Sequence, residues 1–238
     1  MAWMMTVEMH VRSPKFDFDE LDRLKLFKDR SGRTMERGIR FDGVPPVNLT
    51  ARQQDTKKFC DAFHIIGFIC VSEKFREIIE GFEPNAHQFF PITLEAKDGT
   101  RHAGPQYYIF NPCAVIDAYL DVGNAPGWPE LRNLHRPYRA GYEDVALSSQ
   151  EIAGRHVWMG GFLGAGNLFV SDALHAKLVK EKIRYLWFRP LKERDAPWNA
   201  EAEMPMVLAW LEADPARVQD LINRRPDWVR KHRADWML

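Results

Sequence analysis

The sequence predicts an α+β domain with a mixed β-sheet, two related strand–helix–strand units and C-terminal helices. In the first unit, at residues 67–111, apolar strand-like runs flank one amphipathic helix. A shorter version of the same order recurs at residues 167–191, and beyond residue 204 the apolar residues recur at helical spacing. With 45% hydrophobic residues among 238, the chain can form a packed core.

The segment before the first unit predicts less regular structure. Alternating apolar residues predict a half-buried strand over residues 6–11, and a short strand is expected around residues 39–41. A helix is expected to begin at Thr50, because its hydroxyl and the side chain of Gln53 match a capping box. Phe59 and Phe63 would lie on the apolar face of that helix.

The first unit carries the clearest local signals. A continuous apolar run at residues 68–71 predicts a strand buried on both faces. Ser72 then predicts an N-cap, and Gly81 and Pro84 predict the end of the helix. The core-facing stripe at i, i+3, i+4 and i+7 consists of Phe75, Ile78, Ile79 and Phe82. Strands at residues 89–96 and 106–111 follow, joined by a turn around Asp98 and Gly99.

The second unit repeats this order. Residues 170–174 align with residues 71–75, so that Ser171 takes the N-cap position of Ser72. Its helix is expected to bury Leu174, Leu178 and Val179, and a strand is expected at residues 185–188. A strand at residues 157–159 and a glycine-rich turn at 160–166 precede it. A short helix is expected after Asn111-Pro112, with Val115, Ile116 and Tyr119 on one face.

Beyond residue 204 the spacing predicts consecutive helices. The first presents Val207, Leu208 and Leu211 to the core; the second, capped by Asp214, presents Val218, Leu221 and Ile222. A short final helix is expected from Asp227. We therefore divide the chain into an N-terminal strand and loop extension (1–47), an α+β core (48–195) and a C-terminal helical segment packed on the core (196–238).

Charge and composition exclude several classes of protein. Lys and Arg together number 33, as do Asp and Glu, and this balance argues against a nucleic-acid partner. A basic excess from Arg217 onward keeps a nucleic-acid-associated regulator as an alternative. No apolar run approaches a membrane span, and the N-terminus lacks the basic region of a signal peptide. With only three cysteines, the expectation is a cytoplasmic chain without a membrane partner.

Groupings that would carry chemistry are incomplete. Cys60 and His64 have the spacing of half a zinc site, but no second pair follows. The glycine-rich turn lacks the spacing of a phosphate-binding loop, and no serine lies in a nucleophile elbow. His87 stands alone in an aromatic strand, which is typical of a hydrogen-bonded structural histidine. We predict no catalytic residues, no metal site and no cofactor.

Two motifs support a resemblance to a known family. The stretch VSEKFREIIEGFEPNAHQFFPITL…YYIFN, followed by LFVSDALHAKL…FRPL, resembles the family 11 immunity proteins of bacterial polymorphic toxin systems, over about residues 48–191. The resemblance implies a protein that binds and neutralises a cognate secreted toxin, encoded by a neighbouring gene, in a stoichiometric complex. The alternative is an enzymatic immunity factor that reverses a toxin-made modification. Its catalytic pocket would lie near His87, His156 or Asp172.

The acidic and aromatic segment between the two units is the predicted toxin-binding site. Rigid aromatic side chains supply binding energy and charge selects the partner, so a mild acidic excess suits a basic partner such as a nuclease toxin. The alternative, that these aromatic residues pack into the core, is equally open. The predicted contact residues are Asp121, Trp128, Glu130, Tyr138, Tyr142, Glu143 and Asp144.

Overall fold

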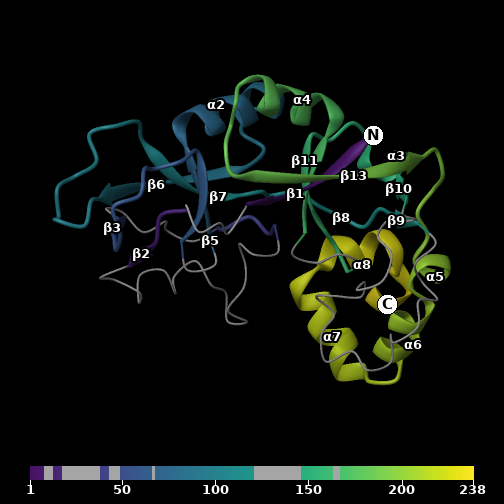
Figure 1. Ribbon diagram of the computed structural model, residues 1–238. Coiled ribbons are helices and arrows are strands. Elements are labelled where there is room, and N and C mark those ends of the chain that lie inside the picture. The colour runs from purple at the N-terminus through teal and green to yellow at the C-terminus, as the bar shows by residue number, and fades with distance from the viewer. Residues whose placement is uncertain (8–12, 18–37, 43–48, 66–67, 121–145, 163–166) are drawn as a thin grey trace. The chain divides into compact units, whose positions relative to one another are not determined.

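The computed structural model describes residues 1–7, 13–17, 38–42, 49–65, 68–120, 146–162 and 167–238 (Figure 1). These residues form an α+β fold with one seven-stranded and one six-stranded mixed sheet, as predicted. The chain divides into two compact units. Unit 1 comprises Met1–Ile116, Gly154–Gly161 and Ala165–Leu191, and unit 2 comprises Asp117–Ala153, Phe162–Gly164 and Lys192–Leu238.

The six-stranded sheet belongs to unit 1 and has the order β2-β3-β6-β7-β5-β4. The neighbours β3 and β6 are parallel, and every other adjacent pair in this sheet is antiparallel. Its strands are β2 (Phe16–Asp17), β3 (Leu49–Gln53), β4 (Ala62–Ile65), β5 (Phe68–Ser72), β6 (Gln88–Glu95) and β7 (Tyr107–Asn111). The Asp98-Gly99 turn joins β6 to β7 as expected.

The seven-stranded sheet has the order β8-β11-β12-β1-β13-β10-β9. Two adjacent pairs are parallel, β8 with β11 and β10 with β13. Its strands are β1 (Ala2–Val7), β8 (Val115–Ile116), β9 (Tyr119–Leu120), β10 (Ala146–Ser148), β11 (Val157–Gly160), β12 (Leu168–Ser171) and β13 (Leu186–Arg194). The strand at the N-terminus thus starts earlier than predicted, and residues 8–12 lie outside the described part of the chain.

The two strand–helix–strand units have the same topology. In the first, α2 (Glu73–Phe82) connects β5 to β6; in the second, α4 (Asp172–Lys180) connects β12 to β13. In both, the two connected strands are parallel to each other and flank one antiparallel strand. That middle strand is β7 in the first strand–helix–strand unit, where it follows β6 along the chain. In the second strand–helix–strand unit it is β1, the N-terminal strand.

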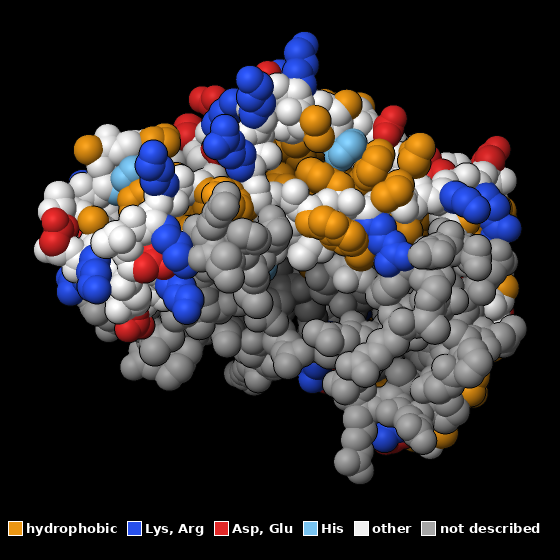
Figure 2. All heavy atoms as spheres, in the orientation of Figure 1, with side chains coloured by type: hydrophobic (Ala, Val, Ile, Leu, Met, Phe, Trp, Pro, Cys, Tyr) orange, Lys and Arg blue, Asp and Glu red, His pale blue; other side chains and the backbone are white. Residues whose placement is uncertain are grey.

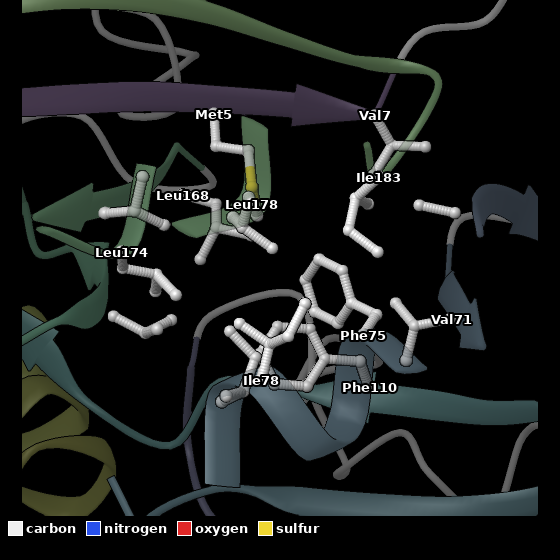
Figure 3. Packing of buried hydrophobic residues seen from close by; sticks show 14 of the residues in the cluster. Met5, Val7, Val71, Phe75, Ile78, Phe110, Leu168, Leu174, Leu178 and Ile183 are labelled. Carbon is white, nitrogen blue, oxygen red and sulfur yellow. The ribbon is translucent and has the colours of Figure 1, made fainter. Parts of the chain in front are cut away.

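Both crossover helices bury one face in a shared hydrophobic cluster of unit 1 (Figure 3). From α2 come Phe75 and Ile78, and from α4 come Leu174 and Leu178. Strand residues complete the cluster, among them Met5, Val7, Val71, Phe110, Leu168 and Val170. A second cluster, which includes Phe63, Phe90 and Ile109, lies among β3, β4, β5, β6 and β7. The six-stranded sheet therefore has apolar residues on both faces, which explains the non-alternating run in β5.

The prediction for Val179 was wrong. This residue of α4 is 55% exposed, whereas Leu174 and Leu178 are fully buried. Successive helical residues are rotated by about 100°, so that Val179 falls beside the buried stripe and on the same face as His175.

Three of the four predicted caps are confirmed. The side chains of Ser72, Ser171 and Asp214 accept hydrogen bonds from the backbone N–H groups of Phe75, Leu174 and Ala216. Each satisfies a donor that the first turn of the helix leaves without a partner.

The fourth cap, Thr50, was wrong, because residues 49–53 form β3 and not the start of a helix. Leu49, Ala51 and Gln53 alternate as buried residues, and β3 pairs in parallel with β6. The buried Gln53 side chain donates to the carbonyl of Lys57 at 2.6 Å. The Thr-x-x-Gln spacing therefore matched a capping box by coincidence, and Phe63 lies in β4.

Two short elements were also predicted wrongly. Val115, Ile116 and Tyr119 lie in the two-residue strands β8 and β9 and not in a helix. β8 pairs with β11, and β9 pairs with β10. These partner strands are more than 25 residues away along the chain, so the local spacing of apolar residues cannot predict the pairing. Residues 39–41 do not form a strand either.

The C-terminal helices of unit 2 follow the predicted pattern. They are α5 (Ala200–Glu203), α6 (Pro205–Glu212), α7 (Pro215–Arg224), α8 (Pro226–His232) and the 3₁₀ helix η5 (Ala234–Met237). Helix α6 buries Val207, Leu208 and Leu211, while α7 buries Leu221 and only partly buries Val218 and Ile222. Unit 2 also contains α3 (Ser149–Ile152). Within the described ranges, every helix is too short or too polar to span a membrane.

The contrast between Leu174 and Val179 gives a direct test of the core. Replacing the fully buried Leu174 by Ala is expected to lower the free energy of unfolding by about 2–5 kcal/mol, because it leaves a cavity. Val179→Ala on the same helix is expected to change it by about 0.5 kcal/mol or less. Urea unfolding followed by circular dichroism measures both. Equal effects would contradict the assignment of the buried face of α4.

Candidate functional site

The predicted toxin-contact residues all fall within residues 121–145, outside the described part of the chain. Asp121, Trp128, Glu130, Tyr138, Tyr142, Glu143 and Asp144 therefore stay a prediction.

Cys60 and His64 do not share a helix face, which their spacing had predicted. Cys60 precedes β4, and its thiol donates to the Ala62 carbonyl, while burial raises its pKa to about 12. His64 lies in β4, where burial lowers its pKa despite hydrogen bonds to backbone carbonyls. Across the described ranges, no three His, Cys, Asp or Glu side chains are grouped so as to hold a metal ion.

The motifs of the first unit instead converge on a buried polar network. We use this name for Glu83, His87, Gln88 and Asn111. Glu83 is the C-terminal cap of α2, His87 and Gln88 lead into β6, and Asn111 ends β7. Glu83 is 8% exposed, His87 5% and Asn111 0%. Buried polar groups need partners, so their hydrogen bonds define what the network does.

Glu83 and His87 form the charged part of this network. The Oε2 atom of Glu83 lies 2.6 Å from Nε2 of His87, and its Oε1 atom accepts the backbone N–H of His156 at 2.8 Å. The other ring nitrogen of His87, Nδ1, accepts the backbone N–H of Cys113 at 3.1 Å. Because Nδ1 is an acceptor, the ring proton lies on Nε2 and is donated to Glu83. Both nitrogens of the ring are therefore engaged.

The environment of Glu83 favours its ionised form. Burial raises the pKa of this carboxyl, but the hydrogen bonds from His87 and from the His156 backbone, with the positive charge of Arg155, outweigh it. The net result is a pKa below the ordinary value of 4.5. The carboxylate is thus a fixed acceptor at neutral pH.

The amide residues of the network hold a segment that lacks regular structure. Gln88 accepts the backbone N–H of Phe41 and donates to its carbonyl, both at 2.8 Å. Asn111 donates to the carbonyl of Ile39 and to Oε1 of Gln88, both at 2.9 Å. Residues 39–41 are therefore attached to β6 and β7 by side chains, and they do not form the predicted strand.

The other candidate groups for an enzymatic role are engaged in local structure. Nδ1 of His156 lies 2.7 Å from the hydroxyl of Ser171, whose oxygen also accepts the Leu174 N–H as a helix cap. Asp172 accepts a hydrogen bond from Nε1 of Trp3 at 2.8 Å. Burial raises the pKa of the Cys113 thiol to about 11, so it is not a thiolate nucleophile at neutral pH. These contacts orient backbone and side chains of the domain itself.

Carboxylates within unit 2 neutralise much of the basic C-terminal tail. Arg217, Arg224 and Arg230 each pair with an aspartate three or four residues earlier on the same helix. Arg233 bonds to Glu201, Glu212 and Asp235, and Lys231 pairs with Glu151. This pairing removes most of the positive field that the nucleic-acid alternative would need.

The described part of the chain is thus an α+β protein in which the motif residues hold the backbone in place. The chain belongs to the Imm11 immunity protein family, whose model matches residues 4–193. The match begins well before residue 48 and reaches into β1, which is an internal strand of the seven-stranded sheet. It ends within β13, so that helices α5 to α8 lie beyond it. No curated protein matches the chain.

The charged part of the network predicts a large effect for one atom. Glu83→Gln keeps the shape but places an amide N–H₂ against one of two donors, the His87 ring or the His156 backbone. We expect a loss of about 3 kcal/mol in the free energy of unfolding. Glu80→Gln is the control, because Glu80 caps the Asn85 N–H on an exposed part of the same region, and less than about 1 kcal/mol is expected. Chemical unfolding measures both.

The same pair tests the ionisation of Glu83. A carboxyl with a lowered folded pKa contributes stability above its unfolded pKa, and that contribution is lost as the pH falls through the folded value. The wild-type protein and Glu80→Gln should lose this stability below about pH 4.5, whereas Glu83→Gln should lack that part of the pH dependence. Parallel curves for all three would contradict an ionised Glu83.

The attachment of residues 39–41 depends on Gly38. Its φ is +71°, and a Cβ atom there would lie 2.7 Å from Cγ of Met159 and 2.9 Å from the carbonyl of Pro112. Gly99 has φ +84° with open space around it, so Gly99→Ala measures backbone strain alone, about 1–2 kcal/mol. Gly38→Ala is expected to cost more, since it adds the clash to the strain. Equal unfolding free energies for the two variants would contradict this packing.

Proposed function

We propose that this protein neutralises a cognate secreted bacterial toxin by forming a one-to-one complex with it. The observation that carries the proposal is the match to the Imm11 immunity protein family over residues 4–193. The complex would cover the toxin's active site or hold the toxin in an inactive form. We place it in the cytoplasm of the producing cell, with the toxin encoded by a neighbouring gene.

Blocking is favoured over an enzymatic mechanism by how the candidate groups are used. A general base must reach a substrate proton with a free nitrogen or oxygen, yet both ring nitrogens of His87 are engaged. His156 is bonded to a helix cap and Asp172 to an indole. These partners fit positioning roles within a scaffold, and binding alone needs no group to turn over.

The toxin-contacting segment that we propose is residues 112–152, with the seven contact residues predicted above. Its aromatic side chains would anchor a basic toxin surface, and its acids would steer the association. Specificity among immunity proteins of one scaffold would then depend on such variable surface side chains.

The test is a titration of the purified toxin domain encoded beside this gene, with affinity and toxin activity measured at each ratio. Tight binding with activity lost at one-to-one stoichiometry is expected. The triple variant Trp128→Ala/Tyr138→Ala/Tyr142→Ala should bind about 100-fold more weakly or worse, because such anchors often contribute 2 kcal/mol or more each.

Three results would count against parts of this proposal. Absence of binding would reject neutralisation by complex formation. Protection far below one-to-one would favour the enzymatic alternative. Unchanged affinity of a folded triple variant would reject the segment as the contact site and leave neutralisation intact.

A further inference from the structure

We propose that a second surface, on unit 1, binds an acidic region of the cognate toxin; this inference rests on the proposed function. We call this surface the aromatic face. It consists of Trp3 from β1, His175 and Val179 from α4, and Leu186 and Phe188 from β13. None of these residues belongs to the buried polar network or to the proposed segment.

Helix and strand geometry bring the aromatic face together. Asp172, His175 and Val179 recur at i, i+3 and i+7 and share one side of α4, beside the buried Leu174 and Leu178. The sheet register places Leu186 opposite Val7, and Phe188 opposite Met5. Met5 and Val7 are buried with Leu174 and Leu178, so these partner pairs lie on the α4 side of the sheet. Leu186, Phe188 and Trp3 pack on the edge of that cluster and are partly exposed.

Its aromatic residues are held in fixed positions. The ring of Trp3 stacks on His175 with 3.8 Å between centroids and 19° between planes, and its Nε1 donates to Asp172 at 2.8 Å. Phe188 meets His175 edge-on at 4.6 Å. A partly exposed tryptophan locked from two sides loses little conformational entropy on binding, which is the property of an interface anchor. Val179, 55% exposed beside it, adds an apolar contact that nothing in the described chain covers.

The charges next to this surface are positive. Lys180, Lys182 and Arg184 follow Val179, are exposed, and have no carboxylate partner within the described ranges. Lys74 and Lys177 close by are already paired with Glu181, and Asp172 is engaged by Trp3. Figure 2 shows hydrophobic side chains gathered around a histidine on this face, with Lys and Arg side chains and some Asp and Glu side chains at its edges. An apolar centre with unpaired cations beside it complements an acidic, partly apolar protein surface.

The experiment measures the affinity and the association rate of four variants for the purified toxin domain. Val179→Asp is expected to weaken binding about tenfold or more, since it puts a carboxylate on the apolar centre facing an acidic partner. Lys180→Glu/Lys182→Glu is expected to lower the association rate about fivefold at about 0.05 M salt and to approach the wild-type rate at about 0.5 M. Both substitute exposed side chains, so folding is preserved; circular dichroism and thermal unfolding check this.

Matched controls lie elsewhere on the surface. Met237→Asp changes an exposed apolar side chain at 43% exposure in η5, and Lys97→Glu reverses an exposed charge in the β6–β7 turn. Both controls should leave the toxin affinity at the wild-type value. Trp3 itself is not substituted, because it lies in an internal strand of the sheet.

The outcomes separate this inference from the proposed function. If the wild-type protein binds the toxin and the test variants bind like the controls, the aromatic face is not a contact surface, while neutralisation stands. If the wild-type protein does not bind, both fail. If Val179→Asp changes only the oligomeric state in sedimentation equilibrium, the face is a self-association surface and the inference is overturned.

Discussion

Insertion of β1 between β12 and β13 is the constraint on which the second half of unit 1 depends. The strand pairs antiparallel with both neighbours, from Ala2 opposite Ser171 and Leu191 to Val7 opposite Leu186. Without it, β12 and β13 would each expose an unpaired edge, and the cluster under α4 would lose Met5 and Val7. The N-terminal residues therefore complete a unit whose other strands lie more than 150 residues later.

The first strand–helix–strand unit has the same arrangement of strands. There the middle strand is β7, and the outer neighbours also correspond. An antiparallel strand flanks β5 and β12 (β4 and β11), and a parallel strand flanks β6 and β13 (β3 and β10). Glu83 connects the two repeats, because it ends α2 and accepts the N–H of His156, which precedes β11. The His156 ring in turn bonds to Ser171, the cap of α4. A short series of hydrogen bonds thus connects one crossover helix to the other through the Glu83 carboxylate.

Local signals made part of this predictable. The apolar stripe of α2 and the caps Ser72, Ser171 and Asp214 depend on residues within one helical turn, and all were found from the sequence. The prediction of a helix cap at Thr50 was wrong because β3 is stabilised by pairing with β6, about 40 residues away. The local spacing of Thr50 and Gln53 also fits a capping box. The predicted burial of Val179 was wrong because an apolar residue can lie one position beyond the buried stripe of a helix. The network of Glu83, His87, Gln88 and Asn111 was visible only as motif matches, since its partners His156, Cys113 and Phe41 come from three separate segments.

The way these residues are used bears on where function can reside. The members of the polar network direct most of their hydrogen bonds to backbone groups or to one another, so that replacing one of them is expected to lower the stability of the fold. Surface residues are free of that constraint. Val179, Lys180 and Lys182 touch no such network, and neither their burial nor their bonding requires their present identity. Under the further inference, a toxin surface that covers Val179 would remove this exposed apolar side chain from water, and the neighbouring lysines would attract its acidic groups. Under the proposed function, recognition would therefore depend on surface positions that the fold itself leaves unspecified.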